Sequence, residues 1–167
     1  MRRILRRREI VEDDWRLAGE DGADGAGNPA LIVPFAEFRT HISKWRAYQG
    51  RLGVRLSPAD AVEDLAEDIR RLSLVAAEFP TPGEGRGYTQ GRLLRSRLQF
   101  KGELRAVGAA VKQDLLFILS RCGFDSFELA PGQKVEEALR ALDRYNVAYQ
   151  PAETVPSIQQ HRYRAAG

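Results

Sequence analysis

The sequence predicts an α/β domain with a mainly parallel sheet made of repeated strand–helix units. Short apolar runs of strand length alternate with longer stretches whose apolar residues recur at helical spacing. The length of 167 residues, with 43% hydrophobic and 29% charged residues, fits one globular domain. Because a strand followed by a helix returns as a right-handed crossover, successive strands are expected to run parallel.

Six segments are expected to be strands: residues 30–33, 53–57, 74–79, 103–107, 126–130 and 146–150. Helices are expected between them. In the helix expected after 53–57, Ser57 stands at the N-cap and Pro58 at the first helical position. The apolar positions of this helix run from Val62 to Leu72. In the helix expected after residue 91, the side with Arg92, Arg95 and Arg97 is expected to face solvent.

Three regions are expected along the chain. Residues 1–29 are irregular or form a β-hairpin, residues 30–150 form a single α/β domain, and residues 151–167 form a tail that is disordered or docks on a partner. The first region contains a dense run of arginines, at positions 2, 3, 6, 7 and 8, followed by Glu9, Glu12, Asp13 and Asp14. Without interleaved aromatic residues, this run is expected to be solvated and partly self-neutralising, and no nucleic-acid partner is expected.

Charges at the centres of four successive strands favour a particular strand order. Arg55, Glu78, Arg105 and Glu128 alternate in sign. If the strands lie side by side in sequence order with these residues on one inner face, each charge has an opposite neighbour. A partial, half TIM-like barrel has this order, whereas a doubly wound sheet shuffles it. The sequence therefore favours the half-barrel, although Glu78 or Glu128 projecting to solvent at a strand end would give the same pattern by coincidence.

The expected half-barrel is too short to close by itself, since a complete eight-unit barrel needs roughly 250 residues. Its inner face must be covered by the N-terminal segment, by the tail or by a second copy of the chain. A homodimer is one of these alternatives.

The stretch "GEGRGYTQG" is the candidate ligand site, because it follows the carboxyl end of the strand at 74–79 and precedes a helix. Backbone amides around Gly85 and Gly87 could bind an anion, with Arg86 adding charge and Tyr88 a ring or hydroxyl. Arg105 and Asp114 are the other candidate contacts. The stretch matches neither the dinucleotide fingerprint nor the Walker loop. A turn that lets the strand enter the helix is the competing interpretation.

Composition argues against several kinds of chemistry. The single cysteine, Cys122, supports neither an internal disulfide nor an iron–sulfur cluster, and two histidines are too few to favour a metal site, so no metal is expected. Cys122 is expected to be a buried thiol. No apolar run is long enough to span a bilayer, so no membrane contact and a cytoplasmic location are expected.

The blocks "GRGYTQGRLLRSRL", "FKGELRAVG" and "QDLLFILSRCGFDSFEL" resemble the bacterial family called domain of unknown function 934. The resemblance extends from about "GRLGVRLSP" onward. Gln99 departs from it, because the family pattern leads us to expect a glycine there. Members are commonly labelled as oxidoreductases of sulfite reduction, and their genes tend to lie beside those of assimilatory sulfite and sulfate reduction. The resemblance supplies no catalytic residues.

Two functions remain open. The first is an accessory protein of assimilatory sulfite reduction that binds a partner, such as sulfite reductase or its electron donor, or a small anion. The alternative is an oxidoreductase that binds a flavin or another phosphate-bearing ligand at the glycine-rich stretch. The sequence has no siroheme, iron–sulfur or nicotinamide signature, which favours the first, and a flavin stays open. Whether the protein is an enzyme is therefore undecided by sequence.

Overall fold

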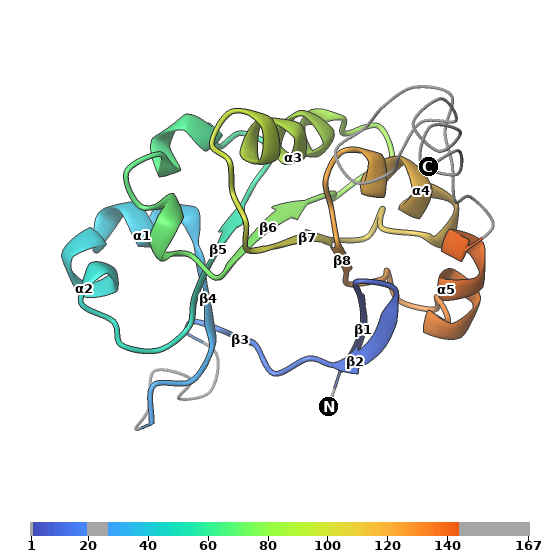
Figure 1. The fold of residues 1–167 in the computed structure, drawn as a ribbon, viewed down its shortest axis with the longest axis horizontal. Helices are drawn as coiled ribbons and strands as arrows, with labels where there is room; N and C mark the ends of the chain where they lie inside the picture. The colour runs from blue at the N-terminus through green and yellow to red at the C-terminus, as the bar shows by residue number, and fades with distance from the viewer. Residues whose placement is uncertain (1, 20–26, 144–167) are drawn as a thin grey trace, which may run out of the picture.

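The computed structural model describes residues 2–19 and 27–143 (Figure 1). Its centre is one eight-stranded sheet in the order β2-β1-β8-β7-β6-β5-β4-β3. The strands are β1 (Arg3–Arg6), β2 (Glu9–Glu12), β3 (Arg16–Leu17), β4 (Leu31–Pro34), β5 (Leu52–Leu56), β6 (Leu74–Glu78), β7 (Glu103–Val107) and β8 (Ser126–Phe127). The expected strand at 146–150 lies outside the described residues.

The strands from β3 to β8 are parallel neighbours in sequence order, as the alternating charges predicted. The sheet is nevertheless mixed, because β1 pairs antiparallel with both β2 and β8. The fold is therefore an α/β half-barrel with a curled, mostly parallel sheet, and the likeness to a TIM barrel is a loose one. The last of these strands, β8, has two residues instead of the five expected.

The helices lie along the outer side of the curved sheet (Figure 1). They are α1 (Phe35–Thr40), α2 (Ile42–Arg46), α3 (Arg86–Ser96), α4 (Leu116–Arg121) and α5 (Val135–Asp143), with 3₁₀ helices η1 (Val62–Leu65), η2 (Ile69–Arg71) and η3 (Gln113–Leu115). Alternate strand residues point outward into the main core, among them Val33, Val54, Val75, Leu104 and Phe127. The helices supply the other half of this core, including Phe38, Leu65, Leu94 and Leu119.

The expected helix from Pro58 to Leu72 is wrong, since the segment contains the two short 3₁₀ helices η1 and η2. The Asp60 carboxylate accepts a hydrogen bond from the amide of Ser57 at 2.6 Å, which is a contact typical of a helix start. The difference lies in the carbonyls that would continue a helix. Gln90 of α3 then donates to the carbonyls of both Ser57 and Asp60, at 2.8 and 2.9 Å. These bonds fix a turn where sequence propensity favoured a helix.

Residues 9–17 form one extended segment that joins the two edges of the sheet. The segment begins as β2, paired with β1 at one edge, and ends as β3, paired with β4 at the other. Residues 13–15 alone connect the two strands. Because an extended residue spans at most about 3.6 Å, the sheet must curl to bring its edges this close. The N-terminal segment thus covers the concave face, which was one of the three coverings expected.

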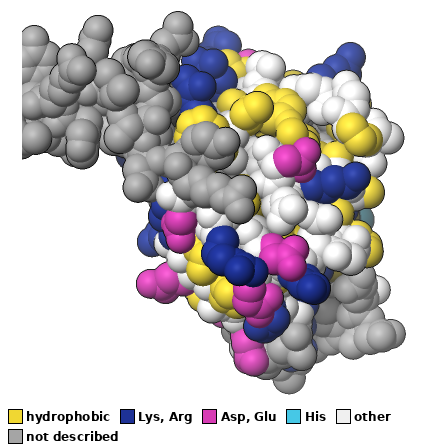
Figure 2. Space-filling model, turned by 90° about the vertical axis from the view of Figure 1, so that its right-hand side faces the viewer, with side chains coloured by type: hydrophobic (Ala, Val, Ile, Leu, Met, Phe, Trp, Pro, Cys, Tyr) yellow, Lys and Arg dark blue, Asp and Glu magenta, His cyan; other side chains and the backbone are white. Residues whose placement is uncertain are grey.

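The expected partial self-neutralisation is confirmed for Arg2 and Asp13, but the N-terminal arginines pair mainly with acids from the second half of the chain. The pairs are Arg2–Asp13 (2.6 Å), Arg2–Glu128 (2.8 Å), Arg3–Glu136 (2.7 Å), Arg6–Glu103 (3.5 Å), Arg7–Asp125 (3.5 Å) and Arg8–Asp143 (2.7 Å). Figure 2, which faces the right-hand side of Figure 1, shows basic and acidic side chains next to one another on the lower part of the surface. The run fastens the hairpin to the remainder of the domain.

The tip of the β1–β2 hairpin has an unusual backbone. Arg7 and Arg8 both have positive φ, at 48° and 64°, and form the two-residue turn between Arg6 and Glu9. Such turns favour glycine or asparagine. The amide of Arg7 donates to the carbonyl of Asp125 at 2.7 Å, and the Arg8 side chain binds Asp143. These contacts stabilise a turn that arginine adopts at a cost.

Candidate ligand site on the concave face

The strand register places one row of side chains along the inner face of the sheet. Arg55 lies beside Ala76, Ala76 beside Arg105, and Arg105 beside Ser126. Residues two positions away on each strand share this face. The inner face therefore has charged residues on β5, β6 and β7 beside the apolar residues of β4 and β6.

Arg105 lies at the centre of a buried network of ion pairs. Its side chain is 0% exposed, and its Nη1 donates to Asp13 Oδ2 at 3.0 Å. Its Nε and Nη2 donate to Glu103 Oε1 at 3.0 and 2.7 Å. Asp13, whose side chain is 1% exposed, also accepts from Arg2. Arg105 therefore holds the N-terminal segment over the sheet, and its donors are occupied by protein carboxylates.

Only two of the four alternating charges, Arg55 and Glu78, pair with each other. Arg55 Nε donates to Glu78 Oε1 at 2.5 Å, across neighbouring strands as the pattern predicted. Arg105 instead pairs with Glu103 and Asp13, and Glu128 pairs with Arg2. The inner-face charges are thus neutralised, but two of them find partners that the pattern did not include.

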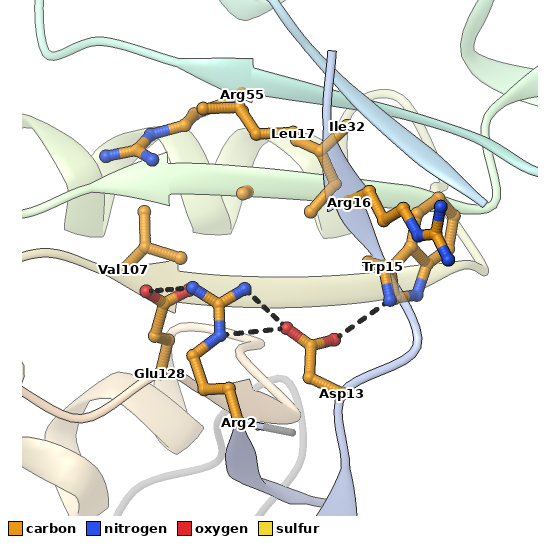
Figure 3. A pocket seen from close by; sticks show the side chains of 10 residues that line it. Arg2, Asp13, Trp15, Arg16, Leu17, Ile32, Arg55, Val107 and Glu128 are labelled. Carbon is orange, nitrogen blue, oxygen red and sulfur yellow. Dashed lines mark hydrogen bonds and ion pairs between the residues drawn. The ribbon is translucent and has the colours of Figure 1, made fainter. Parts of the chain in front are cut away.

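A cavity of about 510 Å³ lies between the N-terminal segment and the sheet (Figure 3). It reaches the carboxyl half of the strands, because its lining includes Val107, which ends β7, and Glu128, which follows β8. Its lining is Arg2, Asp13, Trp15, Arg16, Leu17, Ile32, Arg55, Ala76, Val107 and Glu128. The size is that of small-molecule sites, which measure roughly 300–1,000 Å³.

Within this lining, Arg16 differs from the other two arginines. Figure 3 shows the Arg2 guanidinium between Asp13 and Glu128, while Arg55 and Arg16 extend to opposite sides of the view. Arg2 and Arg55 each form ion pairs, whereas Arg16 is exposed and has no ion-pair partner among the residues that the structure describes. Arg16 pairs in register with Leu31 of the main core, so its side chain leaves the segment on the side opposite to Trp15 and Leu17.

The glycine-rich stretch lies on the opposite, helix-bearing side of the sheet. A Cβ on Gly87 would lie 2.5 Å from the Phe79 ring, and one on Gly91 would lie 2.4 Å from the Phe124 ring. Both phenylalanines belong to the main core. These two glycines therefore let α3 approach the core closely. A Cβ on Gly85, in contrast, would have nothing within 4 Å, so the surroundings of this glycine are open.

The amide at the start of α3 already has an anionic neighbour. The Glu84 carboxylate accepts a hydrogen bond from the amide of Arg86 at 3.0 Å. The Arg86 side chain is exposed. Anion binding by Gly85, Arg86, Gly87 and Tyr88 stays a prediction, and a bound anion would have to share this amide with Glu84.

Tyr88 and Asp114 are brought near one another, but Arg105 is not part of their group. Burial raises the pKa of Tyr88 above its usual 10.0, and the neighbouring charges of Cys122 and Asp114 raise it further. The Tyr88 ring packs edge-on against Phe79 at 5.1 Å. Arg105 points to the inner face, where it binds Asp13 and Glu103. The six predicted contacts are therefore divided between the two faces of the sheet.

Arg95 of α3 is not on a solvated surface, so that expectation is wrong. Its Nε donates to the Gly123 carbonyl at 3.0 Å, and its Nη1 donates to the carbonyls of Phe100 and Gly102 at 2.7 and 2.9 Å. Arg95 also pairs with Asp125 at 3.4 Å. Its planar fork of donors suits this task, because three chain carbonyls converge on it. Arg92 is exposed, as expected, and so is Arg97. Cys122 is partly exposed at the end of α4.

Sequence reasoning missed the half of the cavity that comes from the N-terminal segment. Asp13, Trp15 and Leu17 alternate with the exposed Asp14 and Arg16. This two-residue period is typical of a strand with one covered face, and it was the available signal. The many charged residues next to this segment made the alternation hard to recognise.

Neither a membrane-spanning helix nor a metal site occurs in the part of the chain that the structure describes. No helix there is long and apolar enough to cross a membrane. Within residues 2–19 and 27–143, no group of three His, Cys, Asp or Glu side chains is arranged to hold a metal ion.

A family model described as "Bacterial protein of unknown function (DUF934)" matches residues 53–158. The chain belongs to this family. The DUF934 match covers β6, β7, β8 and the helices α3–α5, and with them Arg55, Ala76, Val107 and Glu128 of the cavity. The N-terminal cavity residues, including Trp15 and Arg16, precede the match. No curated protein matches the chain.

Proposed function

We propose that this DUF934 protein is an accessory protein of assimilatory sulfite reduction, which acts by binding an anionic ligand in the concave cavity. The link to sulfite reduction comes from the family, whose members are commonly labelled with that process. The binding role is supported by the kind of groups that line the cavity.

The guanidinium of Arg55, which lines the cavity and is 33% exposed, is the observation that carries the proposal. A guanidinium remains charged at every physiological pH and donates hydrogen bonds in a planar fork, so it suits recognition of an oxyanion and not proton transfer. The cavity carboxylates Asp13 and Glu128 are bound to arginines. Such pairing holds them in place, which favours binding over acid–base catalysis.

A partner enzyme is the second part of the proposal. Arg86 and Arg92, both on α3, are exposed and have no ion-pair partner among the described residues. Exposed arginines of this kind suit an acidic surface on sulfite reductase or on its electron donor. Contacts of this kind steer association and weaken as salt screens them.

The test measures ligand and partner separately. Isothermal titration with sulfite, sulfate and small carboxylates is expected to detect binding to the wild type, weakened about tenfold or more in Arg55→Gln, because a charge-assisted hydrogen bond is lost. Size-exclusion chromatography with purified sulfite reductase is expected to show a complex that Arg86→Ala weakens. Arg55→Gln serves as the control there, because its change lies in the cavity. Absence of both interactions would overturn the proposal.

A flavin-binding oxidoreductase is the second candidate, favoured by the open surroundings of Gly85 in front of the 11-residue helix α3. Its ligand phosphate would lie at the amides that precede this helix. The absorption spectrum of the protein, incubated with flavin and then desalted, separates the candidates. A retained flavin band that Gly85→Val removes would favour the oxidoreductase.

A further inference from the structure

The floor of the concave cavity is apolar. It is formed by inner-face residues of a hydrophobic cluster that is separate from the main core, namely Trp15, Leu17, Ile32, Ala76 and Val107. Such side chains are stabilised by contact with carbon and gain nothing from the oxygens of an inorganic anion. One water molecule takes about 30 Å³ in the liquid, so an ion such as sulfite would fill a small part of a cavity of about 510 Å³. The floor therefore suits an organic ligand.

Arg55 offers unused hydrogen-bond donors on one side of this floor. Its side chain lines the cavity, and its strand position beside Ala76 places it on the inner face. The Arg55 Nε donates to Glu78, whereas the two Nη groups have no hydrogen-bond partner among the residues that the structure describes. Arg55 can therefore bind a carboxylate through its Nη groups while Glu78 keeps its own bond.

Glu128 offers an unused acceptor on the other side. Its Oε1 accepts a hydrogen bond from Arg2 at 2.8 Å, and its Oε2 has no partner within residues 2–19 and 27–143. Figure 3 shows Val107 between the guanidinium of Arg55 and the carboxylate of Glu128. A carboxylate oxygen that lines a cavity and lacks a donor is complementary to an ammonium group.

We infer that the cavity binds an organic zwitterion, whose carboxylate lies on Arg55, whose ammonium group lies on Glu128 and whose apolar stem crosses Val107. This inference rests on the proposed function, which makes the concave cavity the ligand site and Arg55 its anion-binding group. It goes further by requiring a cationic group on the same ligand, and so ranks a zwitterion above a simple anion.

The charges that face the cavity favour a ligand without net charge. Apart from Arg16, whose side chain leaves the segment on the other side, the charged lining consists of Arg2, Arg55, Asp13 and Glu128. These two arginines and two carboxylates balance. A ligand with an anionic group alone would add a charge without a counter-charge, and uncompensated charge in a partly buried place is costly. A zwitterion leaves the balance intact.

The strand order sets the distance between the two charged groups of the ligand. Arg55 belongs to β5 and Glu128 follows β8, so β6 and β7 lie between them. Neighbouring strands are about 4.8 Å apart, so the two backbones are roughly 14 Å apart along the sheet, and side chains that converge on a concave face shorten this gap. A stem of several methylene groups bridges such a gap. An α-amino acid, whose two charges are on adjacent carbons, does not.

Matched six-carbon compounds test each part of the inference by isothermal titration. The compound 6-aminohexanoate has its two charges at opposite ends of an apolar stem. Hexanoate and hexylamine each have one of these charges, and norleucine has both at the same end. We expect 6-aminohexanoate to bind the wild type about tenfold or more tightly than each of the other three, because each of them lacks or misplaces a charge-assisted hydrogen bond.

Variants of the two charged residues identify where each end binds. Arg55→Gln should weaken 6-aminohexanoate and hexanoate about tenfold and leave hexylamine unchanged. Glu128→Gln should weaken 6-aminohexanoate and hexylamine about tenfold and leave hexanoate unchanged. Arg70→Gln in η2 and Glu37→Gln in α1 are the matched controls, since neither residue lines the cavity or has an ion-pair partner in the described part of the chain. Circular dichroism checks that each variant is folded.

The outcomes distinguish this inference from the proposed function. Binding of 6-aminohexanoate that depends on both Arg55 and Glu128 supports it. Equal or tighter binding of hexanoate or norleucine, or an unchanged affinity for 6-aminohexanoate in Glu128→Gln, overturns it. In that case an Arg55-dependent affinity for hexanoate, sulfite or sulfate leaves the proposed function standing. If neither these compounds nor the inorganic anions bind, both fail.

Discussion

Asp13 and Arg105 are joined by a hydrogen-bonded ion pair of 3.0 Å, although 92 positions separate them in the chain. Both side chains are almost completely buried, at 1% and 0% exposure. A charge in such a place is tolerated because each partner has further partners, Arg2 for Asp13 and Glu103 for Arg105. The pair connects the N-terminal segment to the centre of the sheet.

Replacing Asp13 by asparagine should destabilise the fold strongly. The change leaves the buried Arg105 guanidinium short of one counter-charge, and breaking a buried pair costs about 3–5 kcal/mol. Because Glu103 remains, we expect about 3 kcal/mol in the free energy of unfolding, measured with urea. Asp14→Asn is the matched control. Asp14 pairs with Arg51 at about half exposure, so the expected loss is below about 1 kcal/mol. Equal losses at both positions would contradict the buried network.

The glycines of α3 should differ in their tolerance of a side chain. Gly91→Ala forces a methyl group to within 2.4 Å of the Phe124 ring, and such overpacking costs about 1–3 kcal/mol. Gly85→Ala meets nothing within 4 Å, so it should be neutral or stabilising by up to about 1 kcal/mol. Urea unfolding measures both. A tolerated Gly91→Ala would show that α3 is free to move away from the core.

Replacing Gln99 with glycine should stabilise the fold. Its φ of 55° lies in the left-handed region, which costs a side-chain-bearing residue about 1 kcal/mol or more. This is the position where the family resemblance led us to expect glycine. Gln99→Gly should raise the unfolding free energy by about 0.5–1 kcal/mol, after loss of the hydrogen bond from Gln99 to the Ser96 carbonyl. Gln99→Ala loses that bond and keeps the strain, so a gain there would refute the explanation.

Arg95 should not be replaceable by lysine. Lysine cannot reproduce the planar fork that reaches the carbonyls of Gly123, Phe100 and Gly102. We expect Arg95→Lys to cost about 2 kcal/mol of stability, since buried carbonyls lose their donors. Arg92→Lys on the exposed side of the same helix should change stability by less than about 0.5 kcal/mol. Thermal unfolding of the two variants checks the difference.

Asp125 should make stability fall as pH rises above the acid range. Burial raises its pKa above the usual 3.8, against the opposing effects of the Leu104 amide and of Arg95 and Arg7. A carboxyl with a raised folded pKa keeps its proton more tightly in the folded state. Its contribution is therefore complete below pH 3.8 and is lost as pH rises through the folded pKa.

The measurement for Asp125 is the difference in unfolding free energy between wild type and Asp125→Asn, followed by urea unfolding from the acid range upward. The difference should decrease with rising pH. An increase would mean that the hydrogen bond from Leu104 and the two arginines outweigh burial.

The strand order could be predicted because successive strands carry charges of opposite sign. Arg55 and Glu78 carry opposite signs and lie on neighbouring strands, so their pairing is encoded at a short and regular spacing. The partners of Arg105 could not be found in this way. Asp13 comes from a segment far away in sequence, and a local pattern holds no information on which distant carboxylate approaches.

The candidate site was predicted less well for a related reason. The glycines at 87 and 91 are four residues apart, a spacing that places both on one side of a helix. They serve close packing against Phe79 and Phe124. A glycine that accommodates a ring and a glycine that exposes its amide to a phosphate look alike in sequence. The ring that decides between them becomes visible only in the folded chain.

The pairing of Leu5 with Phe127 has a consequence for the order of events during synthesis. The hairpin leaves the ribosome before the strand that receives it, which is made 122 residues later. Because synthesis proceeds at about 5–20 residues per second, the arginine-rich β1–β2 hairpin remains without its partners for on the order of ten seconds. Long-range pairing of this kind forms late. The hairpin should therefore dock over the cavity as the last step of folding. A nascent chain that lacks β8 would have no complete binding site.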